Sequence, residues 1–441
     1  MDVVVVGAGL GGLAAAVAVH RAGHAVTVLE RGAELRETGA GIGLMPNGVR
    51  ALDALGLGAP VRGRATPLPA GGGLRDRHGR ALLAVDQAAI EARAGAPLVV
   101  VDRTWLHRLL AAALPAGAVR TGTPVESVHD DGRRVRLTVG APPGRHVHVG
   151  SPAGPQRTEH QSAAPPNHVP LTEVPPAPGL RAEQQEAAHP ADVPLADVEA
   201  DLVVVADGAG SRLRAHLFPG HPGLEGSGEC AARALAPAGL AVEPVPGELL
   251  DHCTGERFGC MLMADGRTYW YATWAITDAV PADPAARLAA LRARHADWHP
   301  TVGTLLAATD PAAVHVTETV RLVEPLPALA VGRTALLGDA AHAMTPDLGQ
   351  GGCQAFEDAA ALGALVDGAG PPDVVPALAR YDALRRPRTT ALQRQARQMN
   401  RMLRLRGPAG RLRDTILRAV PGGLAAPALA RQFAFDPPRR G

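Results

Sequence analysis

The first thirty residues constrain the fold most strongly. An apolar, β-branched run from Val3 to Val6 has the length and composition of a buried parallel strand. Three glycines follow it at the spacing typical of dinucleotide-binding proteins: Gly7, Gly9 and Gly12. In that motif the first glycine allows a tight turn, the second lets a pyrophosphate approach the backbone, and the third lets the helix pack close to the strand.

The residues after the glycines complete a βαβ unit. A helix is expected from Leu13 to Arg21, and its first amide groups would point at the phosphate. A second strand, Ala25 to Leu29, delivers Glu30, which lies where a carboxylate can hold ribose hydroxyls. The register of strand, turn, helix, strand and acid predicts a dinucleotide site, but the pattern alone leaves NAD and FAD both open.

Two further apolar strands end in an acidic residue beside a glycine. Residues 200–206 lead to Asp207 and Gly208, and residues 335–337 lead to Gly338 and Asp339. Open α/β sheets bind ligands at the carboxyl ends of their parallel strands. We therefore expect these pairs to lie at the same edge of the sheet as Glu30.

Several other segments have readable patterns. A helix is expected over residues 48–55 with Asn47 as its cap, and strand 97–101 precedes Arg103 and a helix over residues 105–113. Strands near residues 119–128 and 134–139 resemble a hairpin, and residues 375–404 form a long basic helix whose arginines are expected on a solvated face or across a domain boundary. Residues 140–197 are rich in Pro, Gly, His and Ser and lack periodicity, which predicts a disordered insertion.

Composition excludes some classes of function. The chain has 441 residues, 46% of them hydrophobic, and a formal net charge of +1, which gives no electrostatic case for nucleic acid or an anionic membrane. Four cysteines without a CxxC pair, no basic leader and no apolar run of membrane-spanning length favour a cytoplasmic protein without a disulfide framework or a bound metal. A monomer and a homodimer both remain open.

The segment GDAAHAMTPDLGQGGCQAFEDAAAL, which begins at Gly338, makes the pattern specific. It resembles the flavin-contacting segment of single-component FAD-dependent aromatic monooxygenases, the salicylate and hydroxybenzoate hydroxylase group. The glycine triplet, VVVADGAGSRLR, GAGIGLMPNGVRALDALGLG and RYDALRRPR also match that group in order. Two departures are Cys353, where these proteins often have Asn, and the insertion at residues 140–197.

The resemblance implies an α/β fold of the hydroxybenzoate hydroxylase type. It combines a Rossmann-type FAD-binding domain, an interleaved mixed-sheet substrate domain and a C-terminal helix. The FAD-binding domain is expected at residues 1–66, 97–139, 198–224 and 321–370, the substrate domain at 67–96 and 225–320, and the helical segment at 371–441.

The same resemblance assigns cofactor contacts. It places Glu30 on the adenosine ribose, Arg31 near the adenosine, Asp339 on the ribityl chain and Arg103 on the flavin. The glycines that follow Pro346 remove side chains where a planar ring must approach, and the helix beginning near Gly352 would stabilise negative charge on the reduced ring. The full expected FAD-binding set is Gly7, Gly9, Leu10, Gly11, Gly12, Glu30, Arg31, Arg103, Asp207, Gly208, Gly338, Asp339, Gly349, Gln350, Gly351 and Gly352.

The activity implied is hydroxylation of a small aromatic compound, phenolic or an aromatic acid. NADH or NADPH would reduce FAD transiently, and O2 would then form a C4a-hydroperoxide that transfers oxygen. Such chemistry needs no protein nucleophile, so no catalytic side chain is assigned beyond the loop of Pro346 and Gly349. Epoxidation, Baeyer–Villiger oxidation, a flavin reductase or dehydrogenase, and a non-catalytic sensor are the alternatives.

The substrate is expected to contact a strand near residues 268–274. Strand alternation places Tyr269 and Tyr271 on one face and Trp270 and Trp274 on the other. The tyrosine face is the candidate lining for a planar ligand, and the tryptophan face reads as sheet core. His252, Arg257 and His342 are further candidate polar contacts, without a base being assigned among them.

Overall fold

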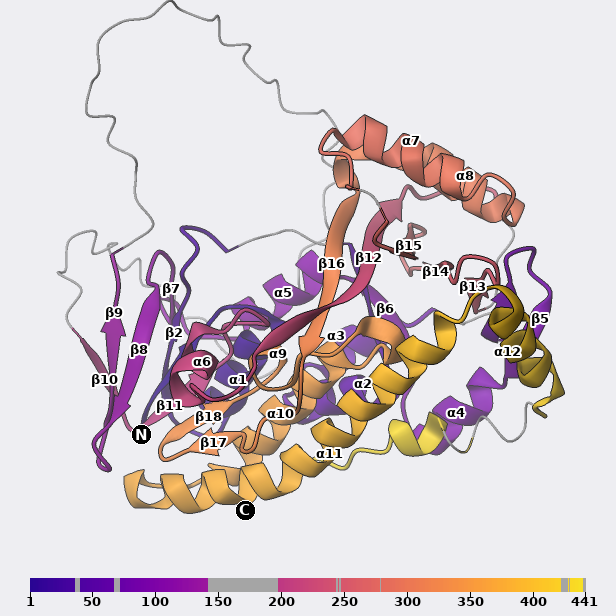
Figure 1. Cartoon of the computed structure of the whole chain (residues 1–441). Coiled ribbons are helices and arrows are strands. Elements are labelled where there is room, and N and C mark those ends of the chain that lie inside the picture. Colours follow the sequence, from indigo (N-terminus) through magenta and orange to yellow (C-terminus); the bar gives the residue numbers. More distant parts are fainter. Residues whose placement is uncertain are drawn as a thin grey trace, which may run out of the picture.

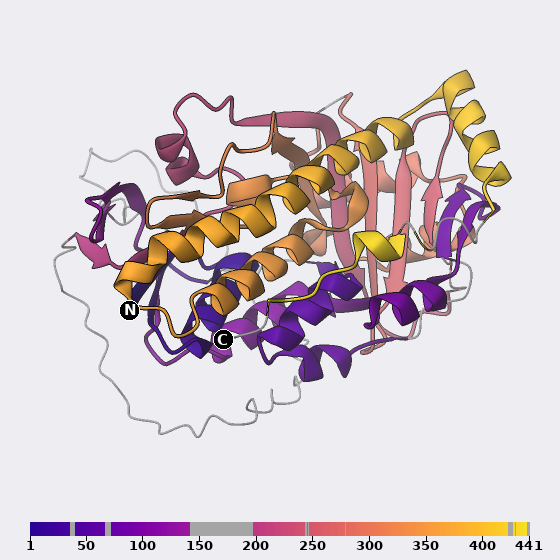
Figure 2. The same cartoon turned by 90° about the horizontal axis from the view of Figure 1, so that it is seen from below.

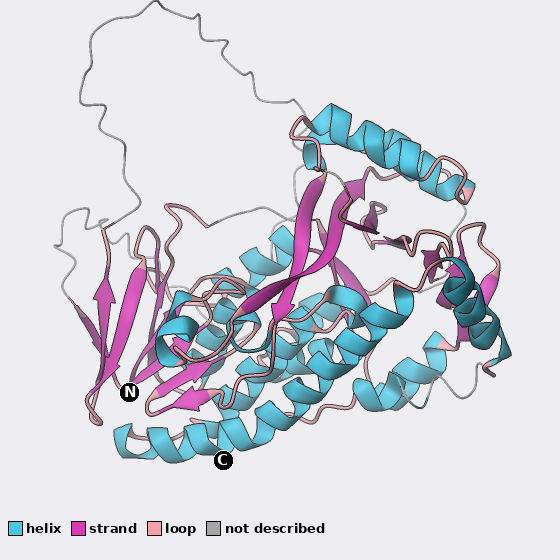
Figure 3. Cartoon of the chain, in the orientation of Figure 1, coloured by secondary structure: helices cyan, strands magenta, loops and turns pink. Residues whose placement is uncertain are grey.

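Four β-sheets with helices packed around them make up the described chain of this computed structural model (Figure 1, Figure 3). The structure describes residues 1–35, 40–66, 72–141, 197–242, 245, 247–277, 279–421, 427 and 429–438. Most of the expected insertion, residues 142–196, lies outside the described residues.

The six-stranded sheet is the parallel sheet that the sequence predicts. Its strand order is β17-β18-β11-β1-β2-β7, and only the β17–β18 pair is antiparallel. The central strand is buried on both faces, with Val3 to Val6 at most 5% exposed, so an unbroken apolar run suits it. The strands are β1 (Asp2–Val6), β2 (Ala25–Leu29), β7 (Val119–Arg120), β11 (Leu202–Val205), β17 (Ala330–Val331) and β18 (Thr334–Leu336).

The seven-stranded sheet is mixed. Its order is β16-β12-β15-β14-β13-β4-β5, with one parallel pair, β13–β4, among antiparallel neighbours. Two chain segments therefore build it, residues 72–85 before β7 and residues 224–322 after β11. The strands are β4 (Gly72–Asp76), β5 (Ala81–Val85), β12 (Leu224–Ala236), β13 (Glu248–Leu250), β14 (Arg257–Leu262), β15 (Thr268–Ala275) and β16 (His315–Leu322).

Two small sheets complete the strands. β3 (Gly41–Leu44) pairs with β6 (Val99–Asp102), and β8 (Val125–Asp130), β9 (Val135–Val139) and β10 (Val198–Ala200) form an antiparallel sheet. The predicted strand at residues 119–128 is interrupted, because Gly122 adopts φ +65° and Pro124 follows it, so β7 and β8 join different sheets. The hairpin around residues 130–132 is confirmed.

The helices cover these sheets and cross between them. α7 and α8 pack on one face of the seven-stranded sheet (Figure 1), and α11 runs beside α10 across the molecule (Figure 2). The helices are α1 (Leu10–Arg21), α2 (Pro46–Ala54), α3 (Gly58–Arg62), α4 (Gln87–Ala94), α5 (Arg103–Ala112), α6 (Arg212–Leu217), α7 (Pro284–Arg294), α8 (Pro300–Ala308), α9 (Asp339–His342), α10 (Gly351–Leu365), α11 (Val374–Leu403) and α12 (Gly407–Ala419), with 3-10 turns η1 (Pro311–Ala313), η2 (Pro346–Leu348) and η3 (Pro371–Asp373). Across the described ranges, none of these helices has the length and apolarity to cross a membrane.

Two predictions about individual side chains are wrong. Asn47 does not cap α2, which begins after Met45; its amide instead bonds to α10 and the turn before it. Arg385 does not lie on a solvated face of α11, because it is fully buried against acidic residues of α10. The partners of Asn47 lie about 300 residues away along the chain, and those of Arg385 about 30 residues away. The local sequence pattern does not reveal partners at these separations.

Candidate active site

A cleft of about 760 Å3 opens at the carboxyl ends of the parallel strands. It runs from the glycine-rich loop after β1 to the loops after β2, β7 and β11. Its lining includes fifteen residues that sequence analysis did not select, among them His107, Arg212 and Glu126, as well as the expected Gly7, Gly9, Glu30, Arg31, Arg103, Asp207 and Gly208. The position agrees with the general rule for ligand sites in open α/β sheets.

The glycine-rich loop has the geometry of a phosphate cradle. Gly7 has φ +103°, and a Cβ on Gly12 would lie 1.9 Å from the carbonyl oxygen of Gly7, so both positions require glycine. At Gly9 a Cβ would meet no described atom within 4 Å, which leaves the backbone open to a ligand. Gly9 is also the N-cap of α1, and no described side chain caps that helix end. Free amides at a helix N-terminus fit a pyrophosphate.

Glu30 is fixed by the backbone beside this loop. Its two carboxylate oxygens accept hydrogen bonds from the N–H groups of Ala8 and Gly32, each at 2.8 Å. A carboxylate has about four lone-pair sites, so two remain for ribose hydroxyls. Arg31 is exposed and lines the same cleft.

Asp207 lines the same cleft as Glu30. Burial raises the pKa of Asp207, and a hydrogen bond with Ser211 acts in the opposite direction. Its Oδ1 is buried and has no hydrogen-bond partner among the described residues. A buried acceptor without a donor is costly, so this atom fits a ligand that brings a hydroxyl or amide.

Asp339 is brought to the same end of the sheet. Arg214 of α6 donates to the carbonyl oxygens of Ala209 (2.7 Å) and Ala340 (3.1 Å), which ties the loop after β11 to α9. Packing around the guanidinium lowers the pKa of Arg103, the Asp339 carboxylate acts in the opposite direction, and Arg233 adds to the lowering. Arg103, Arg233 and Asp339 therefore form a charged group beside the cleft.

The turn from Pro346 to Gly352 lies beside Asp339, and α10, which follows the turn, packs against the start of α1 after the phosphate loop. A Cβ on Gly351 would lie 3.9 Å from Oδ1 of Asp339, and Cβ atoms on Gly11 and Gly338 would both contact the Ala355 side chain, at 3.0 and 3.2 Å. Gly349 adopts φ +62° beside Met45. In the described structure α10 begins at Gly351 without a side-chain cap. The arrangement gives a glycine-lined surface at a positive helix end, where developing negative charge is stabilised.

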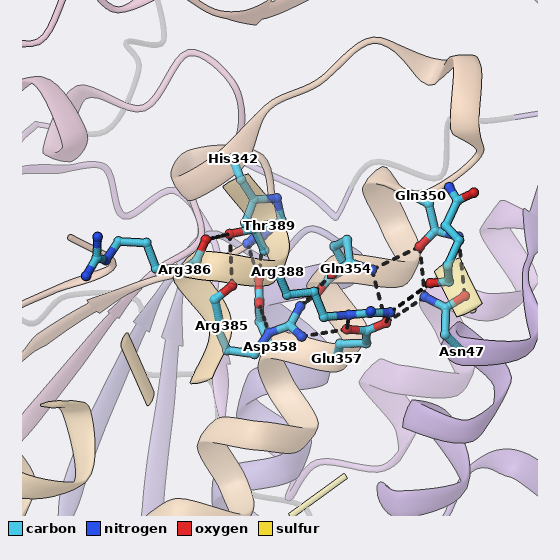
Figure 4. Close-up of polar contacts among 12 residues, drawn as sticks. Asn47, His342, Gln350, Gln354, Glu357, Asp358, Arg385, Arg386, Arg388 and Thr389 are labelled. Atoms are coloured by element: carbon cyan, nitrogen blue, oxygen red, sulfur yellow. Dashed lines mark hydrogen bonds and ion pairs between the residues drawn. The ribbon is translucent and has the colours of Figure 1, made fainter. Parts of the chain in front are cut away.

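A buried polar network holds the start of α10 (Figure 4). The Asn47 amide donates to Oε1 of Gln350 at 2.8 Å and to Oε1 of Glu357 at 2.7 Å. Gln354 donates to both of the same acceptors, at 2.9 and 3.0 Å. All four side chains are at most 1% exposed, so buried hydrogen bonds fix the position of the Gln350 side chain.

The other end of the network reaches α11 and α9 (Figure 4). Arg385 donates to Glu357 at 2.5 Å and to Asp358 at 2.7 Å, and Arg388 donates to Glu357 at 2.6 Å. His342 lies 2.6 Å from Asp358 through its Nε2. Burial would raise the pKa of Asp358, but His342, Arg385 and the Gly338 N–H lower it to about 2. Asp358 is therefore ionised and links three elements around the site.

Cys353 lies inside this packing. It is 1% exposed, accepts a hydrogen bond from the Met45 N–H at 3.4 Å and sits beneath Gly48. Burial raises the pKa of its thiol to about 12. The residue thus serves as a small packed side chain between α2 and α10.

Tyr269 and Tyr271 lie on one face of β15, as alternation predicts. Tyr269 packs in a cluster with Ala40, Val100 and Met263, with Tyr271 at its edge. Trp270 and Trp274 lie in a separate core with α7 and α8. The division of the four aromatic residues between the two faces is therefore confirmed.

A second buried charge cluster joins the tyrosine face to the turn. Arg257 lies 2.8 Å from Asp347 in η2 and 3.5 Å from Glu248 in β13. Burial alone would lower the pKa of Arg257, but Glu248, Asp347 and Glu229 raise it above its usual value. Arg257 is thus surrounded by carboxylates and connects the mixed sheet to the segment before Gly349.

The remaining candidate substrate contact, His252, lies away from the tyrosine pair. His252 occupies the turn after β13, where its Nδ1 is 3.8 Å from Asp414 of α12 and its carbonyl accepts from the Gly407 N–H. Its partners there belong to α12, not to the tyrosine pair. The proximity of Arg233 to Tyr269 and Arg103 was not predicted, since only the pairing of β12 with β15 reveals it.

Comparisons with known proteins agree with this geometry. A family model described as "FAD binding domain" matches residues 1–148 and 181–396. The aurachin C monooxygenase/isomerase of Stigmatella aurantiaca is 29% identical, covering 87% of this chain and 85% of its own. A FAD-dependent urate hydroxylase of Mycolicibacterium vanbaalenii is 30% identical, covering 90% and 87%. The crystal structure of Klebsiella pneumoniae HpxO complexed with FAD and uric acid aligns with TM-score 0.78 at 27% identity, covering 98% and 96%.

Proposed function

The chain belongs to the family of FAD-dependent monooxygenases, and from this premise we propose that it uses NAD(P)H and O2 to hydroxylate a small aromatic or heteroaromatic compound. One observation carries the proposal. Asp339 lies beside the glycine-lined turn at Gly349–Gly352, and α10, which follows the turn, packs on α1 behind the phosphate loop. The tyrosine face of the mixed sheet packs on Gly41 of β3, and Met45, which follows that strand, lies beside Gly349. A flavin that spans these parts would present its ring to a ligand held by the tyrosines.

FAD, when bound, supplies the transfer of two electrons from NAD(P)H to O2 and the delivery of one oxygen atom to the substrate. The chain's contribution is binding and orientation. Glu30 and the amides at Gly9 would hold the adenosine and pyrophosphate, and Asp339 the ribityl chain. The start of α10 would stabilise negative charge on the ring.

We also propose that the regions around the two large sheets bind different ligands. Residues 1–66, 97–139, 198–224 and 321–370 would bind the cofactor, and residues 67–96 and 225–320 would bind the substrate. One connection between them is the contact of Arg257 with Asp347. Dry packing of Tyr269 and Met263 would keep water from the reacting atoms, which protects a reactive oxygen species from hydrolysis.

Spectroscopy and oxygen labelling test the proposal. The purified protein should be yellow or take up FAD, and one aromatic compound should stimulate NAD(P)H oxidation with equal O2 consumption. The product formed under 18O2 should gain one labelled oxygen atom. Turnover in which an electron acceptor replaces O2, or a product without the label, would instead identify a flavin reductase or dehydrogenase.

A colourless protein that FAD cannot reconstitute would refute the proposal at its first step. Parallel assays with NADH and NADPH identify the reductant, and the structure of the product separates hydroxylation from epoxidation and from Baeyer–Villiger oxidation.

A further inference from the structure

His107 of α5 lines the cleft and reaches the glycine-rich loop, although no sequence motif singled it out. Leu106 and Leu110 of the same helix are buried in the core, which anchors α5. Arg103 and His107 stand one turn apart on the helix, and both line the cleft. The role of His107 depends on the proposed function, because the ligand concerned is the FAD of that same cleft.

The residue that His107 contacts is Ala8, which lies in the loop between Gly7 and Gly9. Glycine restricts backbone rotation less than any other residue, so the loop sequence alone does not fix how the peptide groups around Ala8 are oriented. Side chains from two other elements hold them instead. Glu30 after β2 accepts a hydrogen bond from the Ala8 N–H at 2.8 Å, and Nε2 of His107 lies 2.7 Å from the Ala8 carbonyl oxygen.

The contact with a carbonyl settles which hydrogen-bonding role His107 has. A carbonyl oxygen can only accept, so Nε2 carries a proton and donates to Ala8, whether the imidazole is neutral or protonated. The negative end of the Ala8 carbonyl is therefore turned toward a donor. In a trans peptide the C=O and N–H groups point to opposite sides, so the same hydrogen bond directs the Gly9 N–H away from His107.

We propose that His107 is a positioning residue for the pyrophosphate of FAD. Its hydrogen bond keeps the Ala8–Gly9 peptide in one orientation before the ligand arrives. Without that bond, a peptide flanked by glycines would adopt several orientations, and some would direct the Ala8 oxygen at the phosphates. The apparent affinity would then decrease with the fraction of protein that holds the binding orientation. A ligand without phosphates would not depend on this orientation.

Titration of FAD into the full-length protein from which FAD has been removed tests the proposal, with flavin fluorescence as the signal. His107→Leu removes the donor and should weaken FAD binding about three- to tenfold, the range that the net contribution of one hydrogen bond gives. His107→Gln keeps an N–H donor on a side chain of similar reach. It should therefore restore the affinity to within about twofold of wild type.

His24, which follows the C-terminal end of α1, provides the matched control. Its Nε2 also lies 2.7 Å from a carbonyl oxygen, that of Val366, at the end of α1 away from the glycine-rich loop. His24→Leu should therefore lower the free energy of unfolding in urea, as His107→Leu does, but leave the dissociation constant of FAD unchanged. This comparison separates positioning of the loop from a general loss of stability.

ADP and adenosine, used as competitors of FAD, locate the effect on the ligand. ADP carries a pyrophosphate and adenosine carries none. His107→Leu should weaken ADP by the same factor as FAD and leave the affinity for adenosine unchanged. Equal weakening of ADP and adenosine would mean that the whole cleft is disturbed, and it would overturn the inference.

The remaining outcomes distinguish the inference from the proposed function. Unchanged FAD affinity in His107→Leu, failure of His107→Gln to restore binding, or equal weakening in His24→Leu would each overturn the role of His107. The proposed function would stand in all three cases, because the wild-type protein still binds FAD. Failure of the wild-type protein to bind FAD overturns both.

Discussion

Replacing Arg385 with methionine should destabilise the protein far more than any exposed arginine of the same helix does. Arg385 is fully buried and its guanidinium donates to Glu357, Asp358 and the side chain of Gln354. Methionine has a similar length but no charge, so two buried carboxylates would each lose a cation. Removing one partner of a buried ion pair costs about 3–5 kcal/mol.

The neighbouring Arg386 is the matched control. Its side chain is 43% exposed and pairs with Asp382 one turn earlier on the helix. An exposed pair of this kind contributes about 0–1 kcal/mol, so Arg386→Met should be nearly neutral. The assay is urea unfolding followed by circular dichroism and flavin fluorescence at one fixed FAD concentration, because bound ligand adds to apparent stability.

The pH dependence gives an independent check. The pKa of Asp358 is about 2 in the folded protein and near 3.8 when unperturbed, so the folded state favours the ionised form. Its contribution, about 2 kcal/mol, is fully present above pH 4 and is lost as the pH falls toward 2. Without Arg385 this pKa shift is smaller. The difference in the free energy of unfolding between wild type and Arg385→Met should therefore decrease from pH 5 to pH 3. Equal stability of the two arginine variants, or a constant gap across this range, would refute the reasoning.

Three further outcomes are expected. Glu30→Gln should weaken FAD binding by about tenfold in a fluorescence titration, because one acceptor for the backbone amides is lost; unchanged affinity would contradict its place in the site. Gly12→Ala should abolish FAD retention because its Cβ would collide with a loop carbonyl, whereas Gly303→Ala, with no described atom within 4 Å, should retain FAD; equal retention would contradict the cradle. Iodoacetamide at pH 8 should label exposed Cys253 and spare Cys353, whose pKa is about 12, as peptide mass spectrometry would show; equal labelling would refute the burial.

The parts of the fold that depend on local pattern are readable from the sequence. Val3 to Val6 and the glycines after them specify strand, turn and helix within one short segment, and alternation along β15 separates Tyr269 from Trp270. These patterns work because periodicity 2 and periodicity 3.6 are fixed by backbone geometry.

Contacts between residues that are distant in the sequence cannot be predicted in this way. Arg385 stands in a run of arginines, and its charge alone predicts a surface position until α10 supplies Glu357 and Asp358. Asn47 has the side chain of a helix cap, yet its amide serves residues 303 and 310 positions away. Arg233 lies near Tyr269 only because β12 pairs with β15. In each case the deciding contact is tertiary.

The order of strands in the parallel sheet has a consequence during synthesis. Val4 lies beside Val203, and Val203 lies beside Thr334, so the first strand waits for a neighbour about 200 residues away. At about 5–20 residues per second the ribosome needs roughly 10–40 s to produce it. For that time one apolar edge of β1 stays uncovered on the nascent chain, and a chaperone that binds extended apolar segments would find its target there. Completion of the sheet also requires β18, which is synthesised more than 100 residues after β11.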